Sequence, residues 1–531
     1  MGYDILDGMK STGYNKRLFT LISILASIFV YTGAVAIYFY ANGWRLDPQG
    51  EIFIKTGVLT VQSDPSLANV YVEGKQEGRT PKSISLPVGT YNISAYRSGY
   101  VQWEKSIEIK EERSTPVQPW LIKEEILKSN IFSLSEKTYV NSWINDSQNY
   151  IYFLTKSPLT TSLLYRYELY RFDINTTFWD LSSNPKVVLT LDLAQDSTVD
   201  LLLSPSGILA VLQITDKITT KSYLLNSTQS SNLASMEELN ISTLSSYKMS
   251  WSLNNQYLMF DSKADLISYD ISKQTRYLLI KKVAGKEYIW STDEQGSFYT
   301  IEENIENTNE NVYSYSLVQH QMDGSSAKVL LDDLYFQKDK GYIEQYKDDD
   351  QEGKYAPFTN SPQSTKSVGK IQSIRIHQGA KGIYIKTETS AYWYSMDNQK
   401  YYLISPYPSQ FVRFSPDNYK LIYKDTQGYN VFTFNKQDGD HTVELGSQNI
   451  KDLNIESKNV NWISNSTYIW YEKDNTLYIA DKDGDNRVEI LKDLDTLKYF
   501  VITISSDKVY TFYFDKKDTS DDIYIDSYLF R

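Results

Sequence analysis

The sequence contains no cysteine and only three histidines, His320, His377 and His441, which lie far apart along its 531 residues. The lack of thiols excludes disulfide bonds, cysteine zinc sites and thiol nucleophiles together. The sequence also lacks a Gly-x-Ser-x-Gly nucleophile elbow, a P-loop and a dinucleotide-binding fingerprint. We therefore predict a protein that is not an enzyme, with no catalytic residues, no cofactor and no metal ion.

Positive charge is also scarce, because 54 lysines and arginines stand against 66 acidic residues and give a formal net charge of −12 at pH 7. Such a chain has no basic stripe to neutralise phosphates, so we expect no nucleic-acid partner. Glycine and proline are not enriched, and aromatic residues make up 14%, including 45 tyrosines. This composition is neither disordered nor fibrous. The length predicts several domains or one large repeat array.

A long apolar run lies near the N-terminus. The residues from Leu18 to Tyr40 carry no charge and are numerous enough to cross a bilayer as a helix. Lys16 and Arg17 precede the run and favour an N-terminus inside the cell, although the bias is small because Arg45 follows on the other side. The sequence therefore predicts a membrane partner for this segment.

A cleaved secretory signal peptide is the alternative, because Ala34-Val35-Ala36 resembles a small-residue cleavage site. The apolar run is longer than a usual signal-peptide core and continues past Ala36, which favours an uncleaved anchor. We predict a cytoplasmic tail over 1–17 and a transmembrane helix over 18–40. The bulk of this single-pass protein of the cell membrane would then lie outside the cell.

The segment 57–110 alternates apolar and polar residues between regular turn signals, which predicts a small antiparallel β-domain. Its ordered residues resemble the PEGA domain of bacterial surface proteins, with Ser66-Leu67 where the family has Glu-Gly and Glu73 where Asp is usual. The matching positions are Pro65, Ala68, Gly74, Gly78, Thr80, Pro81, Gly89, Gly99 and Tyr100. The resemblance implies an extracytoplasmic β-sandwich that acts as a spacer or interaction module without a catalytic role. We interpret its glycines as requirements of backbone turns.

Residues 111–119 combine charge, Ser-Thr and proline and do not continue the alternation, so we predict a linker there.

From 120 to 531 a unit of short strands recurs, and its clearest copy is Gln410–Asp440. In that copy a Ser-Pro-Asp-Asn turn and a Gln-Gly turn separate three strands rich in aromatic and β-branched residues. A repeat of this kind predicts the blades of a β-propeller.

One apolar residue on the first strand anchors each copy of the repeat. These anchors are Trp143, Leu203, Trp251, Trp290, Ile374, Phe414, Trp462 and Ile502. They predict eight blades, or seven if the region around Ile374 is an insertion. The turns resemble those of TolB-like, PD40-type propellers, which bind widely different ligands. The predicted fold class is all-β: a transmembrane helix, a small PEGA-like β-sandwich and a large β-propeller.

Three features of the repeat array have two interpretations each. The repeated tryptophans fit packing between blades better than carbohydrate stacking. Asp481–Asn486 resembles the start of a calcium loop, but Lys492 stands where a bidentate glutamate is required, which favours a hairpin turn. A polar insertion over 335–370 interrupts the repeat and is either functional or disordered.

These observations favour a membrane-anchored binding or display protein that engages a protein or an envelope glycan outside the cell through its propeller. One alternative is a propeller-type carbohydrate hydrolase or lyase that uses carboxylates and tyrosines around the propeller axis. Another is a structural subunit of a cell-envelope assembly. The binding residues are not identified by the sequence.

Overall fold

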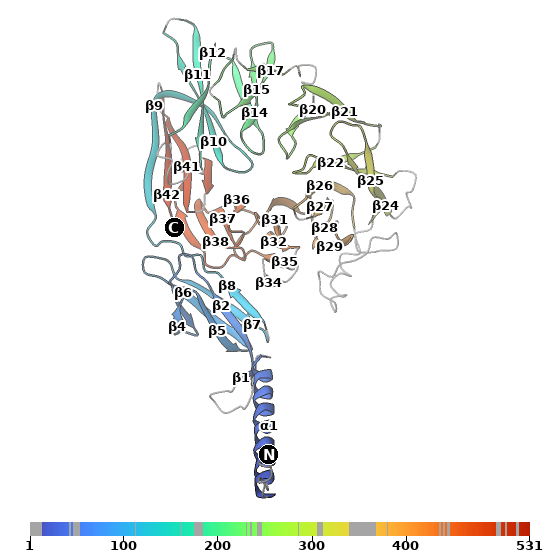
Figure 1. Ribbon diagram of the computed structural model, residues 1–531. Coiled ribbons are helices and arrows are strands. Elements are labelled where there is room, and N and C mark those ends of the chain that lie inside the picture. The colour runs from blue at the N-terminus through green and yellow to red at the C-terminus, as the bar shows by residue number, and fades with distance from the viewer. Residues whose placement is uncertain are drawn as a thin grey trace, which may run out of the picture. The chain divides into compact units, whose positions relative to one another are not determined.

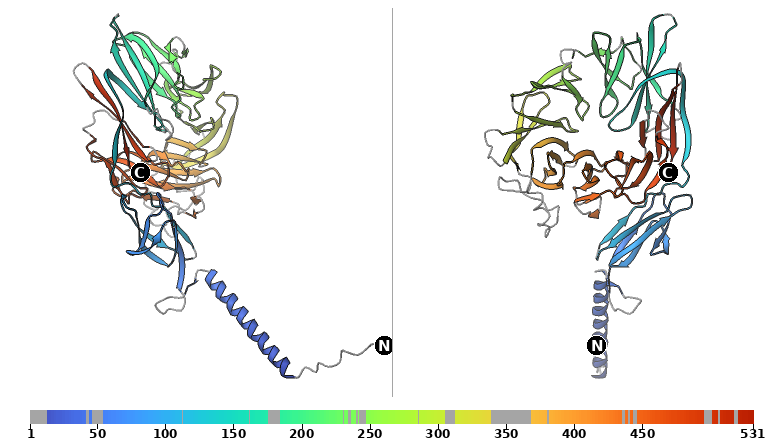
Figure 2. Two further views of the ribbon diagram at one scale, coloured as in Figure 1. Left: turned by 60° about the vertical axis from the view of Figure 1, so that its left-hand side comes forward. Right: turned by 180° about the vertical axis from the view of Figure 1, so that it is seen from behind.

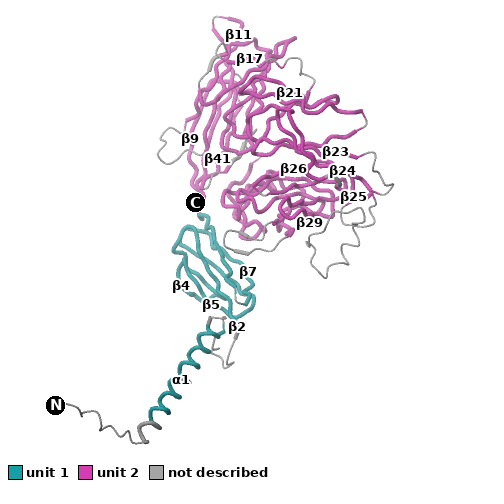
Figure 3. The backbone as a smooth tube through the Cα atoms, turned by 45° about the vertical axis from the view of Figure 1, so that its right-hand side comes forward, with its two compact units in different colours: residues 1–124 teal, residues 125–531 magenta. Residues whose placement is uncertain are grey.

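The structure is a computed structural model of the chain. It describes residues 13–531 except 42–43, 46–53, 112, 161, 175–183, 230, 234–235, 240, 242–246, 285, 305–311, 339–367, 380, 435–436, 439–440, 443–445, 495–500, 505–506 and 517–519. The chain divides into two compact units, an N-terminal unit (Met1–Glu124) and a propeller unit (Glu125–Arg531) (Figure 3). The predicted cytoplasmic tail lies mostly outside the described residues.

Helix α1 (Gly13–Ala41) contains the predicted membrane segment. Its stretch Leu18–Tyr40 has a mean hydropathy of 2.1, and none of it is buried inside the protein. A helix rises about 1.5 Å per residue, so this stretch is long enough for the hydrocarbon core of a bilayer. The helix therefore has the length and composition of a membrane anchor or of a signal sequence.

The rest of the N-terminal unit is a sandwich of two sheets around one apolar core, as the resemblance to the PEGA domain implies. One sheet contains β1 (Trp44–Arg45), β2 (Ile54–Val61), β5 (Lys82–Pro87) and β8 (Ser114–Val117), and the other contains β4 (Lys75–Arg79), β3 (Asn69–Val72), β6 (Gly89–Tyr96) and β7 (Trp103–Ile109). The core side chains come from both sheets and include Leu59, Val70, Ile93 and Trp103. Alternate residues of each strand point inward, which explains the period of two in the sequence.

The predicted linker over 111–119 is wrong, because strand β8 pairs in parallel with β2. The side chains of Val117 and Leu121 are buried in the sandwich core. The sequence pattern did not show this, since β8 is short and contains a proline. The two units instead meet at Glu124, so the propeller does not begin at residue 120.

In the propeller unit, antiparallel four-stranded sheets whose strands follow chain order and one larger sheet succeed one another around a ring (Figures 1 and 2). The four-stranded sheets are β13 (Thr198–Leu203), β14 (Leu209–Thr215), β15 (Thr220–Asn226) and β17 (Glu237–Glu238); β18 (Lys248–Trp251), β19 (Tyr257–Asp261), β20 (Asp265–Asp270) and β21 (Thr275–Lys281); β22 (Tyr288–Thr292), β23 (Phe298–Glu303), β24 (Val312–His320) and β25 (Ala327–Gln337); β26 (Ile371–His377), β27 (Gly382–Thr387), β28 (Ala391–Ser395) and β29 (Lys400–Ser405); β30 (Gln410–Phe414), β31 (Lys420–Asp425), β32 (Gly428–Thr433) and β35 (Gly446–Asn449); and β36 (Lys458–Trp462), β37 (Tyr468–Lys473), β38 (Thr476–Asp481) and β39 (Val488–Leu491). A small hairpin of β33 (Gln437–Asp438) and β34 (His441–Thr442) lies between β32 and β35 in the chain.

An eight-stranded sheet joins the beginning of the propeller unit to its end. Its strands are, in order, β16 (Ser231–Asn232), β12 (Lys186–Ala194), β11 (Leu164–Asp173), β10 (Tyr150–Pro158), β9 (Leu127–Ile144), β42 (Asp521–Leu529), β41 (Lys508–Lys516) and β40 (Val501–Ile504). The first part of β9 pairs with β42 and its second part pairs with β10. Because two predicted blades merge in this sheet, the blade number of eight or seven stays a prediction.

Apolar clusters form the core of the propeller unit. Two of them lie between consecutive sheets: one joins β10–β12 to β13–β15, and another joins the β22–β25 sheet to the β26–β29 sheet. A third lies within the eight-stranded sheet and joins β10 and β11 to β41 and β42. Trp251 and Trp462 are buried in two more of these inter-sheet clusters. The prediction that the repeated tryptophans pack between blades is therefore confirmed for these two residues.

The turn after the first strand recurs with the same geometry. In the turn between β30 and β31, the Ser415 hydroxyl accepts a hydrogen bond from the Lys420 amide at 2.9 Å, and Asn418 has a left-handed φ of 63°. Equivalent pairs of a polar first residue and a left-handed fourth residue are Asn145 and Gln148, Ser204 and Gly207, Ser252 and Asn255, and Asp293 and Gly296. The turn that the repeat predicted is thus present in several sheets.

These turns also bond to the turns of the next sheet. The Asn145 side chain donates to the Pro205 carbonyl at 3.0 Å, and the Ser206 amide donates to the Asn255 side chain at 2.8 Å. Further along the chain, the Asp417 amide donates to the Ser466 hydroxyl at 2.9 Å. Polar turn residues therefore hold neighbouring sheets in register on one edge, while the apolar clusters fill the space between the sheets.

Two other predicted segments have a definite outcome. Residues 335–337 belong to the end of β25, so the polar insertion begins later than predicted, and most of it lies outside the described residues. Asp481–Asn486 joins β38 to β39, with the Asp481 amide bonded to the Asp485 carbonyl and Gly484 at a left-handed φ of 89°. The hairpin interpretation of this loop is confirmed.

Candidate binding pocket

A pocket of about 420 Å³ opens on the first strands of three consecutive sheets in the propeller unit. These strands are β18, β22 and β26, and β22 and β26 lie near one another in Figure 1. The lining residues are Lys248, Ser250, Trp251, Leu253, Asp261, Tyr288, Ile289, Trp290, Ser291, Thr292, Gln372, Ser373, Ile374 and Arg375. Pockets of this size are typical of small-molecule and ligand-binding sites in proteins.

Two tryptophans on equivalent positions of the repeat form part of the pocket wall. The indole nitrogen of Trp251 donates to the Leu202 carbonyl of the preceding sheet at 2.9 Å. The indole nitrogen of Trp290 donates to Asp261 Oδ2, also on the preceding sheet, at 3.0 Å. A buried indole needs a partner for its N–H, and each neighbouring sheet supplies one. The two rings are therefore fixed in place before any ligand arrives.

Asp261 is the acidic residue of the pocket wall, and its charge is already balanced. Lys282 forms an ion pair with Asp261 and also donates to the Ser262 carbonyl at 2.6 Å. With Trp290 bonded to the second carboxylate oxygen, Asp261 has a structural partner on each side. A carboxylate held in this way serves to position Trp290, and the described pocket wall offers no second carboxylate for acid–base catalysis.

Two basic side chains at the pocket have no such partner. Lys248 and Arg375 are exposed, and among the described residues no hydrogen bond or ion pair is formed by either side chain. Lys248 lies opposite Asp261 in the β18–β19 register, but Asp261 is engaged by Lys282 instead. The uncompensated charge of the pocket is therefore positive, in a chain whose net charge is −12.

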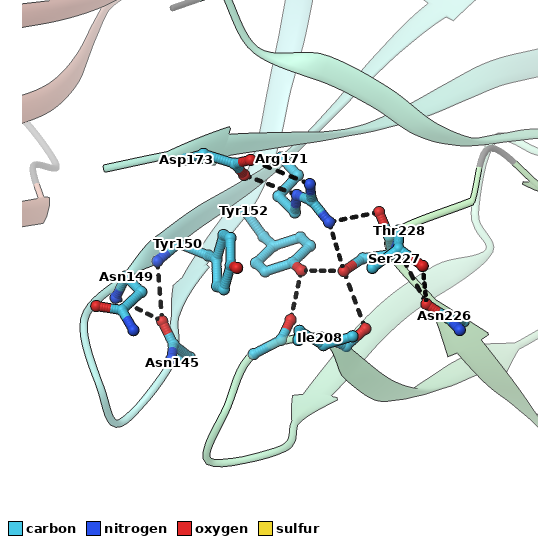
Figure 4. Close-up of polar contacts among 11 residues, drawn as sticks. Asn145, Asn149, Tyr150, Tyr152, Arg171, Asp173, Ile208, Asn226, Ser227 and Thr228 are labelled. Carbon is cyan, nitrogen blue, oxygen red and sulfur yellow. Dashed lines mark hydrogen bonds and ion pairs between the residues drawn. The ribbon is translucent and has the colours of Figure 1, made fainter. Parts of the chain in front are cut away.

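A polar cluster around Arg171 has a different character (Figure 4). Arg171 forms two hydrogen bonds to the Asp173 carboxylate, at 2.8 and 3.1 Å, and donates to the Ser227 carbonyl at 2.6 Å. Tyr152 donates to Ser227 Oγ at 2.7 Å, and burial raises the pKa of the Tyr152 hydroxyl to about 12. These contacts join β10 and β11 to the end of β15. Because these groups bond to one another, the cluster stabilises the contact between two sheets.

Two histidines of the propeller unit, His320 and His377, are half-buried. Burial lowers the pKa of His320 and of His377, which keeps both imidazoles neutral at pH 7. His377 packs edge-on against Phe414 with a centroid distance of 4.4 Å. Among the described residues, no group of three or more His, Asp or Glu side chains could hold a metal ion.

The predicted PEGA-like positions lie in the turns of the sandwich. Gly74 has a left-handed φ of 76° in the turn between β3 and β4, and Gly99 has a φ of 81° before Tyr100. The Asp64–Pro65 and Thr80–Pro81 peptide bonds are cis. Thr80 is buried and accepts a hydrogen bond from the Ala68 amide at 3.1 Å. These contacts connect turns and strands, as the structural interpretation of the motif requires.

Comparison with known proteins supports this part of the fold. Residues 56–124 match the PEGA domain. The match ends at the boundary between the two units and includes β8, in agreement with the corrected position of that segment. No curated protein sequence matches the chain significantly.

Solved structures with weak similarity to the chain include several kinds of protein. A eukaryotic initiation factor is 11% identical, with a TM-score of 0.39 and coverage of 68% of this chain and 90% of that one. The WD40 domain of SCAP from fission yeast is 10% identical, with a TM-score of 0.38 and coverage of 76% and 94%. Prolyl oligopeptidase B from Galerina marginata is 11% identical, with a TM-score of 0.37 and coverage of 71% and 54%, so this chain matches about half of that enzyme. No function is transferred from these similarities.

Neither the pocket nor its two basic residues was predicted from the sequence. Lys248 and Arg375 stand in two copies of the repeated first strand, within the segments KMSW and IQSIRIH. A charged residue in a strand that otherwise packs against its neighbours was the available signal. It could not show that three first strands leave a space between them, because this depends on how the sheets are placed.

Proposed function

We propose that the protein is a membrane-anchored binding protein that displays its propeller outside the cell and holds a glycan or protein of the cell envelope. The pocket between β18, β22 and β26 is the observation that carries this proposal. Its walls are fixed by hydrogen bonds to neighbouring sheets, and such preorganisation lowers the entropic cost of binding. Helix α1 and the PEGA domain support a position at a membrane surface.

The proposal is for binding without catalysis. The acidic residue of the pocket wall is paired with Lys282, whereas most glycosidases require two carboxylates on opposite sides of the bond that breaks. A carbohydrate hydrolase or lyase and a structural subunit of an envelope assembly remain the alternative hypotheses.

The test uses the detergent-solubilised full chain, screened against a glycan panel and against envelope extracts, with products followed over time. We expect one class of ligand to be retained without cleavage. The variant Gln372→Trp places a large side chain at the pocket wall and should abolish retention, whereas Gln321→Trp, in the exposed turn between β24 and β25, should not. Cleavage of a retained glycan, or retention unaffected by Gln372→Trp, would contradict the proposal.

A further inference from the structure

The charge of the pocket indicates the chemical class of its ligand. This inference rests on the proposed binding function. Lys248 and Arg375 are exposed, line the same pocket and have no partner among the described residues. The carboxylate of Asp261 cannot neutralise them, because Lys282 and Trp290 occupy it. An acidic ligand would therefore find two available cations at this pocket.

The two cations supply different kinds of contact. A guanidinium presents N–H groups in a planar fork that matches the two oxygens of a carboxylate or phosphate, whereas an ammonium acts as a compact point charge. Arg375 is therefore suited to fix the orientation of an oxyanion, and Lys248 to add attraction without a strict direction. The overall charge of −12 repels acidic ligands elsewhere on the protein, which favours their binding at this positive pocket.

The other residues of the pocket wall indicate the kind of molecule to which the anionic group is attached. Ser250, Ser373 and Gln372 offer hydroxyl and amide groups, which can donate to and accept from a ligand rich in hydroxyls. The half-buried indole of Trp290 supplies apolar surface, and the negative face of an aromatic ring attracts the C–H groups of a sugar ring. A wall that combines these groups in about 420 Å³ fits a saccharide better than an extended acidic peptide.

We propose that this pocket binds an acidic saccharide, with its carboxylate or phosphate held by Arg375 and Lys248 and its ring against the indole of Trp290. The carboxylate of a uronic acid and the phosphate of a sugar phosphate share this chemistry. Both ligands use the same two cations, so both lose affinity when either cation is removed.

The experiment measures the binding of digalacturonate, mannose 6-phosphate, maltose and inorganic phosphate to the detergent-solubilised full chain by calorimetry. Digalacturonate and mannose 6-phosphate distinguish the two sources of the anion, maltose tests the sugar without charge, and inorganic phosphate tests the charge without a sugar. We expect at least one acidic saccharide to bind more tightly than maltose and inorganic phosphate. Its affinity should fall as sodium chloride is raised, because salt screens exposed charges.

Variants assign the interaction to the two cations. Arg375→Gln and Lys248→Gln should each weaken the binding of the acidic saccharide about tenfold to a hundredfold, the range expected for loss of one charge-assisted hydrogen bond. Arg375→Lys, which keeps the charge but loses the fork, should recover only part of this loss. Lys328→Gln is the matched control, because Lys328 is an exposed lysine on β25 outside the pocket wall. Unchanged melting temperatures would show that the variants are folded.

The outcomes separate this inference from the proposed function. Equal binding of maltose and the acidic saccharides, or full affinity in the Lys248→Gln and Arg375→Gln double variant, would overturn the acidic-saccharide inference and leave the binding function intact. Capture of an acidic peptide at the pocket in place of any saccharide would overturn it in favour of a protein partner. If no glycan or envelope protein binds the full chain at all, the proposed function itself fails.

Discussion

At the scale of single residues, the buried side chains of Ser63 and Thr80 connect two loops of the PEGA sandwich. Their hydroxyl groups form a hydrogen bond with each other. Ser63 also donates to the Pro65 carbonyl at 2.8 Å, and Thr80 accepts from the Ala68 amide. The sequence motif places these residues in order, but their shared hydrogen bond exists only after the two loops meet. This contact gives a physical reason for a threonine at position 80.

Replacing Thr80 by valine should destabilise the N-terminal unit by about 1–3 kcal/mol, because the isosteric side chain removes the acceptor of the Ala68 amide and the hydrogen bond to the Ser63 hydroxyl. Urea unfolding of the N-terminal unit measures the change. Thr90→Val, at an exposed position on β6, is the control and should change stability by less than about 0.5 kcal/mol. Equal stability of the two variants would show that the hydroxyl pair is unimportant.

Buried tyrosines make the stability of the propeller unit sensitive to alkaline pH. Burial raises the pKa of Tyr152, Tyr392 and Tyr471 to about 12 in each case, above the value of about 10 for a tyrosine in an unfolded chain. Between these values the folded state binds more protons than the unfolded state, so stability is complete below pH 10 and falls as the pH rises toward 12.

Each such tyrosine should lower the free energy of unfolding by up to about 1.4 kcal/mol per pH unit in this interval. Denaturant unfolding from pH 8 to pH 12 measures the slope, and absorbance near 295 nm reports phenol ionisation. Tyr392→Phe removes one ionisable group and should make the slope shallower. A free energy of unfolding that stays constant from pH 10 to pH 12 would contradict this prediction.

At the scale of secondary-structure elements, strand β9 connects β10, near the beginning of the propeller unit, to its last strand, β42. Its first part pairs with β42 from Leu127↔Leu529 to Lys137↔Asp521. Its second part pairs with β10, so this one strand joins the two ends of the repeat array. Apolar side chains of both neighbours, including Phe153 and Ile525, share one buried cluster beside it.

The absence of native cysteine allows a clean test of this closure. Ser129 and Ser527 are cross-strand partners, so the double variant Ser129→Cys with Ser527→Cys should form a disulfide under mild oxidation. The bond would close a loop of about 400 residues and should stabilise the oxidised protein by about 2–5 kcal/mol. Gel mobility without reductant and thermal unfolding measure the two effects.

The control pairs Ser129→Cys with Lys516→Cys, which lies at the far end of β41. Cross-linking as efficient in this control as in the matched pair would contradict the β9–β42 register. Failure of the matched pair to cross-link in the folded protein would contradict the closure itself.

At the scale of the whole molecule, the N-terminal helix has the length and composition of a membrane anchor or of a signal sequence. Leu18–Tyr40 is apolar throughout and is exposed along its length within the protein, so a bilayer is the environment that would cover it. The same features occur in signal sequences, and the length of the run favours an anchor.

We expect the mature protein to keep its first 40 residues and to remain in the membrane pellet after alkaline carbonate extraction. Ile28→Arg should release part of the protein, because an arginine near the centre of a membrane helix costs about 2.5–3.5 kcal/mol on insertion scales. Ile28→Leu is the control and should remain membrane-bound. A mature N-terminus directly after Ala36 would show that the segment is a cleaved signal peptide.

Features that depend on a local pattern of residues could be predicted from the sequence alone. The uncharged run over Leu18–Tyr40, the alternation of the sandwich strands and the polar turns such as Ser415–Asn418 each have a local physical cause, and the structure contains all three. The PEGA motif was identifiable for the same reason, since its turn residues stand at fixed distances along the chain.

The features that join distant segments of the chain could be seen only in the tertiary structure. Strand β8 contains a proline and lacks an apolar pattern, yet its backbone completes the sheet beside β2. Strand β9 is divided between two partners, β10 and β42, that begin 371 residues apart (from 150 to 521), and no local pattern marks that division. The pocket exists because three first strands leave a space that their side chains do not fill, and Lys248 and Arg375 become neighbours of one space only through that packing. Local sequence encodes strands and turns, whereas closure and binding sites arise from the positions of whole sheets.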